Sequence, residues 1–242
     1  MRSVMVFAIY GMLLMVFLAA AGMFFYACSV PSSKIFKPVV IRGPEEGRRI
    51  VLSFDDGPAP PFSEQILDIL REKKVPAAFF VCGQNVERYP EIARRIVTEG
   101  HTLGNHTYSH PFLYFRSQER MADEIDRTQE VVEKATGVRP RVFRPPYGAR
   151  WPGLMGVLSR RGIKLTMWSV TGFDWKCKAD EIIQHILRAL RPGSIILLHD
   201  GREVLPAGQF SRSDTVAALP TIIDRAREAG LTFVPLDEFV PQ

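Results

Sequence analysis

Short apolar runs alternate with longer amphipathic stretches from about residue 47 to the end of the chain. A short apolar run bounded by turn residues is typical of a buried strand, and an apolar stripe repeating every three to four residues is typical of a helix. The apolar runs predict strands at residues 49–54, 77–82, 102–107, 142–144, 164–170, 194–198 and 231–234. The amphipathic stretches predict helices at residues 62–74, 89–99, 117–136, 179–190 and 215–229.

The alternation of strands and helices predicts an α/β domain with a parallel sheet, either open or closed into a barrel. The polar residues best suited to chemistry all lie just after predicted strands: Asp55-Asp56, His106 to His110, Arg144 to Tyr147, Asp174-Trp175 and His199-Asp200. In a (β/α) barrel these positions converge at one mouth, whereas an open sheet would spread them along an edge. We therefore expect a (β/α) barrel of about seven parallel strands.

The N-terminal segment has a different pattern, because no charged residue occurs between positions 4 and 28. This length of about 25 residues exceeds the roughly 20 that a helix needs to cross the hydrocarbon of a bilayer. A cleaved signal peptide has a shorter apolar core, and here Met23-Phe24-Phe25-Tyr26 continues the run past Ala19-Ala20-Ala21. The pattern favours an uncleaved transmembrane helix, and cleavage would instead give a secreted protein.

The chain is accordingly divided into a membrane segment at residues 1–28, a linker at residues 29–46 and a catalytic domain at residues 47–242. Proline and glycine at positions 31, 38, 43 and 44 indicate the linker. Arg2 precedes the apolar segment, and Lys34, Lys37 and Arg42 follow it. By the positive-inside rule, this distribution favours a cytoplasmic domain.

Composition excludes some classes of function. The net charge is +5, and acidic and basic residues are interspersed along the chain. No run of Lys and Arg is interleaved with aromatic residues as in a single-strand binder, so we expect no nucleic-acid partner. The three cysteines do not form a disulfide framework.

Asp56, His106 and His110 form a set of two imidazoles and one carboxylate. Three protein ligands leave positions open for water and substrate, which a hydrolytic metal requires. Zinc is the default ion, and cobalt, nickel and iron also suit these ligands. Two histidines alone are more often surface or core residues, but their combination with Asp-Asp after an apolar strand favours a metal site.

Three further residues predict acid–base chemistry. Asp55, beside a metal-binding Asp56, is suited to take a proton from water, although Asp-Asp-Gly-Pro also favours a plain turn. A paired Arg144 would keep Asp55 ionised, and the alternative for Arg144 is a surface ion pair. His199 follows a buried strand and is suited to protonate a leaving amine.

Taken together, five ordered motifs resemble the NodB-type polysaccharide deacetylases of carbohydrate esterase family four, over nearly all of the chain after residue 47. The motifs are Ser53-Phe54-Asp55-Asp56-Gly57-Pro58, His106-Thr107-Tyr108-Ser109-His110, Arg144-Pro145-Pro146-Tyr147, Trp175 and Leu197-Leu198-His199. The resemblance implies a distorted (β/α) barrel of about seven strands. It also implies a base at Asp55, metal ligands at Asp56, His106 and His110, and a general acid at His199.

The resemblance further implies that Arg144 orients the base and that the backbone amide of Tyr147 helps to bind the oxyanion. Trp175 would form a wall of the acetate pocket, and Leu197 would contact the acetyl methyl group. The chain departs from the family pattern at one position, where Thr171 replaces an Asp that tunes the catalytic histidine. Asp174 is retained beside Trp175 and is the rival for that tuning role.

The expected function is metal-dependent removal of N-acetyl groups from an envelope or extracellular glycan, such as peptidoglycan, a chitin-like oligomer or an exopolysaccharide. One alternative is the same machinery acting on an O-acetyl ester or on a lipid-linked sugar amide. A catalytically silent glycan-binding module is a third reading, although all the motif residues are present. Such substrates lie outside the cytoplasm, so function favours a single-pass membrane protein with an extracytoplasmic domain, against the charge distribution.

Overall fold

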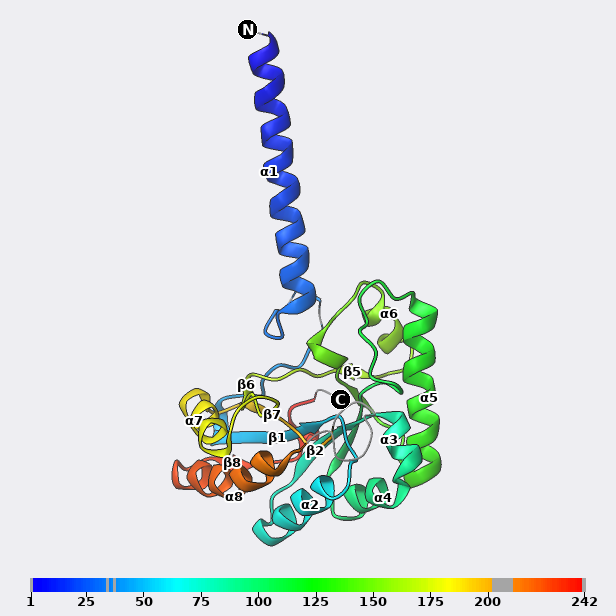
Figure 1. The fold of residues 1–242 in the computed structure, drawn as a ribbon, viewed down its shortest axis with the longest axis vertical. Helices are drawn as coiled ribbons and strands as arrows, with labels where there is room; N and C mark the ends of the chain where they lie inside the picture. The colour runs from blue at the N-terminus through cyan, green and yellow to red at the C-terminus, as the bar shows by residue number, and fades with distance from the viewer. Residues whose placement is uncertain (1, 34, 37, 202–210, 241–242) are drawn as a thin grey trace.

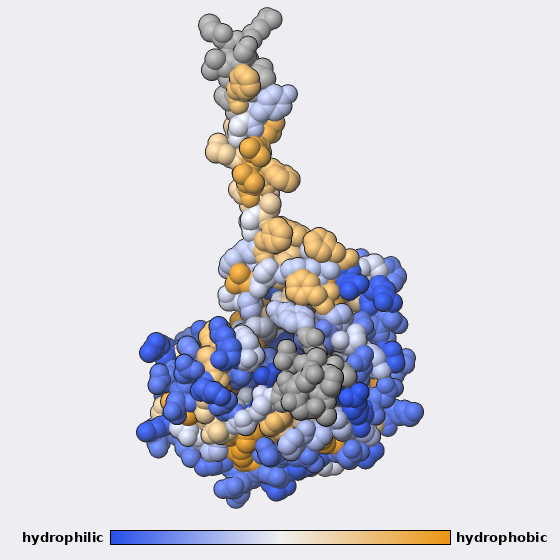
Figure 2. Space-filling view, in the orientation of Figure 1, coloured by the Kyte–Doolittle hydropathy of each residue, from blue (hydrophilic) through white to orange (hydrophobic). Residues whose placement is uncertain are grey.

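The computed structural model describes residues 2–33, 35–36, 38–201 and 211–240. One long helix, α1 (Arg2–Ser29), projects away from an α/β domain that contains the remaining elements (Figure 1). Residues Ile9–Ser29 of this helix are long and apolar enough to cross a membrane. Hydrophobic residues cover most of the coloured part of α1 and continue onto the domain where the helix meets it, whereas most of the visible domain surface is hydrophilic (Figure 2).

The strands of the domain form one sheet with parallel pairing. They are β1 (Arg49–Asp55), β2 (Ala77–Val81), β3 (Thr102–Asn105), β4 (Val142–Phe143), β5 (Lys164–Leu165), β6 (Val170–Thr171), β7 (Ile195–His199) and β8 (Thr232–Phe233). Their order is β5-β4-β3-β2-β1-β7-β6, and β8 pairs with the start of β1. Within the described residues β5 and β6 do not pair with each other, so the sheet is a curled half-barrel. The expected α/β fold of about seven parallel strands is confirmed.

The predicted strand at residues 164–170 is wrong in one respect, because the structure divides it into β5 and β6 at opposite ends of the sheet. Between them the N–H of Thr166 bonds to the carbonyl of Phe143, the chain bends at Ser169, and the N–H of Ser169 bonds to the carbonyl of Ile195. The segment therefore crosses the gap of the half-barrel and changes partner from β4 to β7. A continuous apolar run does not reveal such an exchange of partners.

The helices of the domain are α2 (Phe62–Lys73), α3 (Gly83–Arg88), α4 (Pro90–Thr98), α5 (Gln118–Thr136), α6 (Leu154–Ser159), α7 (Ala179–Ala189) and α8 (Ser213–Glu228). Single 3-10 turns lie at Glu46–Arg48, Pro146–Gly148 and Leu236–Glu238. The long helices match the predicted ranges to within about two residues, the usual uncertainty of helix ends. The helices α3 and α6 were not predicted, because six residues are too few to establish a helical period.

The alternation of side chains along β1 determines the direction in which Asp55, at the end of the strand, points. Leu52 and Phe54 pack in the core cluster that the helices α2 and α8 share, whereas Val51 packs in the cluster inside the half-barrel. Successive side chains of a strand point to opposite faces. Ser53 and Asp55 therefore share the inner face with Val51, and Asp55 points into the half-barrel.

The segment expected to be a linker lies against the domain over part of its length. Val40 forms a bridge with Thr166, and Arg42 forms one with Ser194. Ile41 is buried in the core cluster that contains Phe143 and Leu165. Residues 40–42 therefore contribute to the packing of the domain.

Candidate active site

Asp56, His106 and His110 come together after the strands β1 and β3. Both imidazole Nε2 atoms approach Oδ1 of Asp56, at 3.3 Å from His106 and 3.1 Å from His110. All three side chains are buried, and their potential ligand atoms lie within 4.8 Å of one another. Asp56 and His110 have positive φ angles of 76° and 55°, a costly conformation for such residues that clusters at functional sites.

The surroundings of this cluster suit a divalent metal. The Nδ1–H of His106 donates to the backbone carbonyl of Arg144 at 2.6 Å, which leaves the Nε2 lone pair of His106 for a ligand. Burial alone raises the pKa of Asp56, but its hydrogen bonds with His106 and His110 outweigh burial and hold that pKa well below its usual range. The site therefore offers two imidazoles and an ionised carboxylate, and this donor set fits zinc or a similar ion.

Asp55 is held by a fully buried arginine, Arg144, which follows β4, on the far side of β2 and β3 from β1. Nη1 of Arg144 donates to Oδ1 of Asp55 at 2.6 Å and to Oγ of Ser53 at 3.0 Å. Its Nη2 donates to the carbonyl of Met167 at 3.0 Å. Burial lowers the pKa of Arg144, and the facing Asp55 opposes that shift. The second oxygen of Asp55 lies 3.8 Å from Nε2 of His106, so this carboxylate faces the metal cluster.

His199, at the end of β7, is paired with Asp174 and not with Thr171. Oδ1 of Asp174 lies 2.8 Å from Nδ1 of His199, and its Oδ2 accepts the His199 backbone N–H and the Thr215 hydroxyl, both at 2.8 Å. Burial lowers the pKa of His199, but the charge of Asp174 and its hydrogen bond outweigh burial and raise the pKa to about 9. The hydroxyl of Thr171 accepts the N–H of Phe173, and among the described residues it forms no hydrogen bond with His199.

Two aromatic rings and one leucine border the space between these groups. Trp175 is half exposed and meets the ring of His199 edge-on at 5.4 Å. Tyr147 is also half exposed, and its ring lies 4.7 Å from that of His110. Leu197 is buried on β7, two residues before His199. The structure thus brings the predicted site residues toward one region. Thr171 pairs with Leu197 in the sheet, but among the described residues it forms no hydrogen bond with His199.

Asp200 supports the turn after β1, a role that the sequence did not reveal. Its carboxylate accepts the N–H of Gly57 at 3.1 Å and the hydroxyl of Ser63. A Cβ at Gly57 would lie 2.0 Å from Asp200 Oδ2, so the turn requires glycine there. Burial, assisted by the charges of Asp56 and Asp55, raises the pKa of Asp200 to about 7. Asp200 directly follows His199 in the sequence, but nothing in the sequence indicated which groups its carboxylate contacts.

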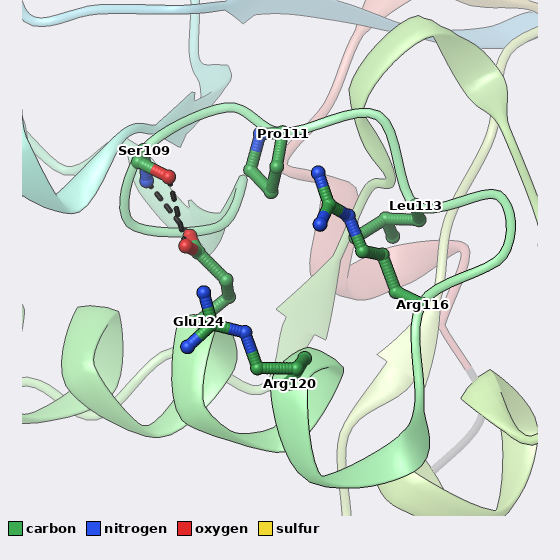
Figure 3. Close-up of a pocket in the computed structure, with 6 residues that line it drawn as sticks. All are labelled: Ser109, Pro111, Leu113, Arg116, Arg120 and Glu124. Carbon is green, nitrogen blue, oxygen red and sulfur yellow. Dashed lines mark hydrogen bonds between the residues drawn. The ribbon is translucent and has the colours of Figure 1, made fainter.

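Glu124 supports the loop that carries both histidines. Its Oε2 accepts the backbone N–H of Tyr108 at 2.9 Å. The same oxygen accepts the backbone N–H of Ser109 at 2.8 Å, and Oε1 accepts the Ser109 hydroxyl at 2.8 Å (Figure 3). The conformation of the loop between His106 and His110 therefore depends on α5. Glu124 lies on a helix face among other charged residues, so the sequence carried no signal for it.

A half-barrel with two acidic residues, a two-histidine cluster and a carboxylate-paired histidine at its mouth is typical of a metal-dependent hydrolase. Residues 42–166 match the polysaccharide deacetylase family. A peptidoglycan-N-acetylglucosamine deacetylase of Bacillus cereus is 38% identical over 195 residues, which are 80% of this chain and 69% of the relative. A chitooligosaccharide deacetylase of Bradyrhizobium sp. is 36% identical over 200 residues, which are 79% of this chain and 90% of the relative. The chain belongs to the polysaccharide deacetylase family, whose members here are hydrolases of N-acetyl groups.

Solved structures agree with this assignment. A peptidoglycan N-acetylglucosamine deacetylase in complex with 4-naphthalen-1-yl-N-oxidanyl-benzamide superimposes with a TM-score of 0.78 at 36% identity, covering 83% of this chain and 92% of that one. A protein from Bacillus anthracis described as a pseudoenzyme of carbohydrate esterase family four gives a TM-score of 0.76 at 28% identity. It covers 84% of this chain and 68% of that one.

Proposed function

We propose that this protein is a metal-dependent deacetylase that removes N-acetyl groups from a glycan of the cell envelope. The observation that carries the proposal is the division of labour between two adjacent carboxylates. Asp56 faces the two histidine Nε2 atoms, whereas Asp55 is held by the buried guanidinium of Arg144. One carboxylate is therefore available as a ligand and the other as a base.

Asp56, His106 and His110 would hold the metal, with zinc as the expected ion and cobalt, nickel or iron as alternatives. A divalent metal held there supplies Lewis acidity toward the acetyl carbonyl oxygen and toward water. Asp55 accepts the proton of the attacking water, and its hydrogen bond with Arg144 keeps it oriented. The fit of the donor set supports this assignment.

His199 donates a proton to the departing amine, because its pairing with Asp174 keeps the imidazole protonated at neutral pH. Asp174 therefore takes the tuning role that the family pattern gives to the position of Thr171. The backbone amide of Tyr147 contributes to the oxyanion site. Trp175 and Leu197 border the acetyl group, which suits the apolar methyl of an acetate.

The substrate class rests on the relatives, which are named for peptidoglycan and for chitooligosaccharides. Both contain N-acetylglucosamine, so an acetamido sugar is the shared feature. A lipid-linked acetylated sugar is a second candidate, which is favoured by the direct attachment of the domain to α1. We propose that α1 remains as a single-pass anchor and that the domain lies outside the cytoplasmic membrane.

The test is acetate release by the full-length protein in detergent, with peptidoglycan, chitooligosaccharides and a lipid-linked acetylated sugar as substrates. Metal content is measured on the same samples, and His106→Ala is expected to lose both metal and activity. Arg139→Ala, on an exposed surface, is the matched control. Full activity of the His106→Ala protein, or no acetate from any of these glycans with metal present, would overturn the proposed function.

A further inference from the structure

Aromatic side chains form a continuous strip from the foot of α1 to the catalytic site. Phe24 of α1 meets Trp151 edge-on, with ring centroids 5.6 Å apart. Trp151 also contacts Tyr114 and Phe115, at 5.5 and 4.6 Å. These contacts join the helix to the loop that leads from β3 to α5.

The strip continues from this loop to a histidine of the metal cluster. The ring of Phe112 lies 4.4 Å from that of Tyr114 and 5.6 Å from that of Tyr147. Tyr147 in turn lies 4.7 Å from His110. We call Phe24, Trp151, Tyr114, Phe115, Phe112 and Tyr147 the aromatic strip.

Several members of the aromatic strip are exposed, and the catalytic site does not account for all of them. Phe115 is 81% exposed and Phe112 is 48% exposed. Single exposed aromatic residues are ordinary, but a contiguous exposed group marks a contact surface. This group is continuous with the apolar surface of α1, and continuity with a bilayer-spanning helix favours lipid as its partner.

Two arginines stand beside the aromatic strip. Arg116 lies in the loop and Arg120 in the first turns of α5, and both extend toward the hollow between Pro111 and Glu124 (Figure 3). Within the described ranges neither forms an ion pair with a carboxylate. Aromatic rings with adjacent cations suit the interfacial region of a bilayer, where rings sit at headgroup level and cations meet phosphate.

The junction between α1 and the domain is fixed by hydrogen bonds. The guanidinium of buried Arg150 donates to the carbonyls of Ser33 and Val30, and its backbone N–H donates to that of Cys28 at 2.9 Å. The hydroxyls of Ser29 and Tyr114 lie 2.7 Å apart. The end of the helix therefore sets the position of the loop relative to the bilayer.

The length of α1 gives the depth of the aromatic strip. About 20 residues at 1.5 Å per residue cover the roughly 30 Å of hydrocarbon. The apolar span Ile9–Ser29 ends five residues beyond Phe24, about 7.5 Å at 1.5 Å per residue, so Phe24 lies near the domain end of the span. Trp151 and Phe115 lie at the same level, because they are in contact with Phe24 or with each other. We infer that the aromatic strip, with Arg116 and Arg120, is a surface that binds the lipid headgroup region, so that the catalytic site opens beside the bilayer. This inference rests on the proposed membrane anchoring.

The test measures the contact of position 115 with lipid in the full-length protein. Phe115→Cys and, as a matched control, Val138→Cys are each made with Cys177→Ser, since the other cysteines are buried. Val138 is an exposed apolar residue just past the far end of α5. A bimane on each cysteine is then quenched by nitroxide-labelled headgroups in vesicles of phosphatidylcholine and phosphatidylglycerol. We expect quenching at position 115 at least several-fold above that at position 138.

Each outcome decides the inference. Equal quenching at the two positions in protein that floats with the vesicles would overturn it, and so would failure of the protein to float. A bimane at position 115 that responds to soluble chitooligosaccharide and not to lipid would also overturn it, because the surface would then bind glycan. Arg116→Gln with Arg120→Gln should reduce quenching in the anionic vesicles. Lipid contact without acetate release would refute the proposed deacetylase activity alone.

Discussion

Asp174→Asn tests whether a carboxylate keeps His199 protonated. The pKa of His199 is raised to about 9, from an ordinary value of 6.5, although burial lowers it. The raised pKa means that the imidazolium persists below about pH 9 and is lost as the pH rises through that value. An asparagine retains the size of the side chain but removes the charge. The alkaline limb of kcat/KM should therefore move down by about one pH unit or more, and one unit leaves roughly tenfold less protonated acid at high pH.

The assay is the pH profile of kcat/KM for acetate release, which reports groups of the free enzyme. Thr171→Val is the control, because the hydroxyl of Thr171 contacts the N–H of Phe173 and not His199. Its limb should coincide with that of the wild type. If Asp174→Asn left the limb in place, His199 would not be the titrating acid. A limb lowered by Thr171→Val would instead return the tuning role to position 171.

Three further results are expected. Asp55→Asn should keep the metal and lose about 10²–10⁴-fold in turnover, because the substitution removes a base and not a ligand. Metal content is measured by elemental analysis, and loss of the metal would show that Asp55 is a ligand. Glu124→Gln should weaken metal affinity about 10–100-fold, because the amide of glutamine cannot accept all the hydrogen bonds that the histidine loop donates to Glu124. Unchanged affinity in a chelator titration would show that Glu124 does not support the metal site. Protease added to intact spheroplasts should digest the domain, and protection until lysis would put it in the cytoplasm.

Sequence predicted the order of elements because buried strands and amphipathic helices carry strong periodic signals. It also predicted that Asp56, His106 and His110 would meet, since each follows a strand of a parallel sheet. The exchange of partners within residues 164–170 was missed, because Thr166 and Ser169 bond to different strands within a single run of strand-like sequence. Periodicity reports the burial of a residue and carries no information about its neighbours.

The supporting contacts of the site were harder to predict than its motifs. The sequence did not show whether Thr171 or Asp174 tunes His199. The answer depends on which of the two side chains points at His199, and the turn after β6 determines that direction. Glu124 and Asp200 act through backbone N–H groups of distant segments. Such contacts depend on tertiary packing, which leaves no spacing pattern in a single sequence.

The bridges of Val40 and Arg42 affect how a soluble form of this enzyme should be made. Val40 accepts the N–H of Met167, and the N–H of Val40 donates to Leu165. A protein that begins at residue 45 would lack Val40, Ile41 and Arg42. The backbone groups that pair with Val40, and the core position that Ile41 fills, would then be exposed at the open side of the half-barrel. Exposed strand edges recruit other strands, so such a protein would tend to aggregate. A version that removes the helix but begins before residue 38 keeps this edge covered.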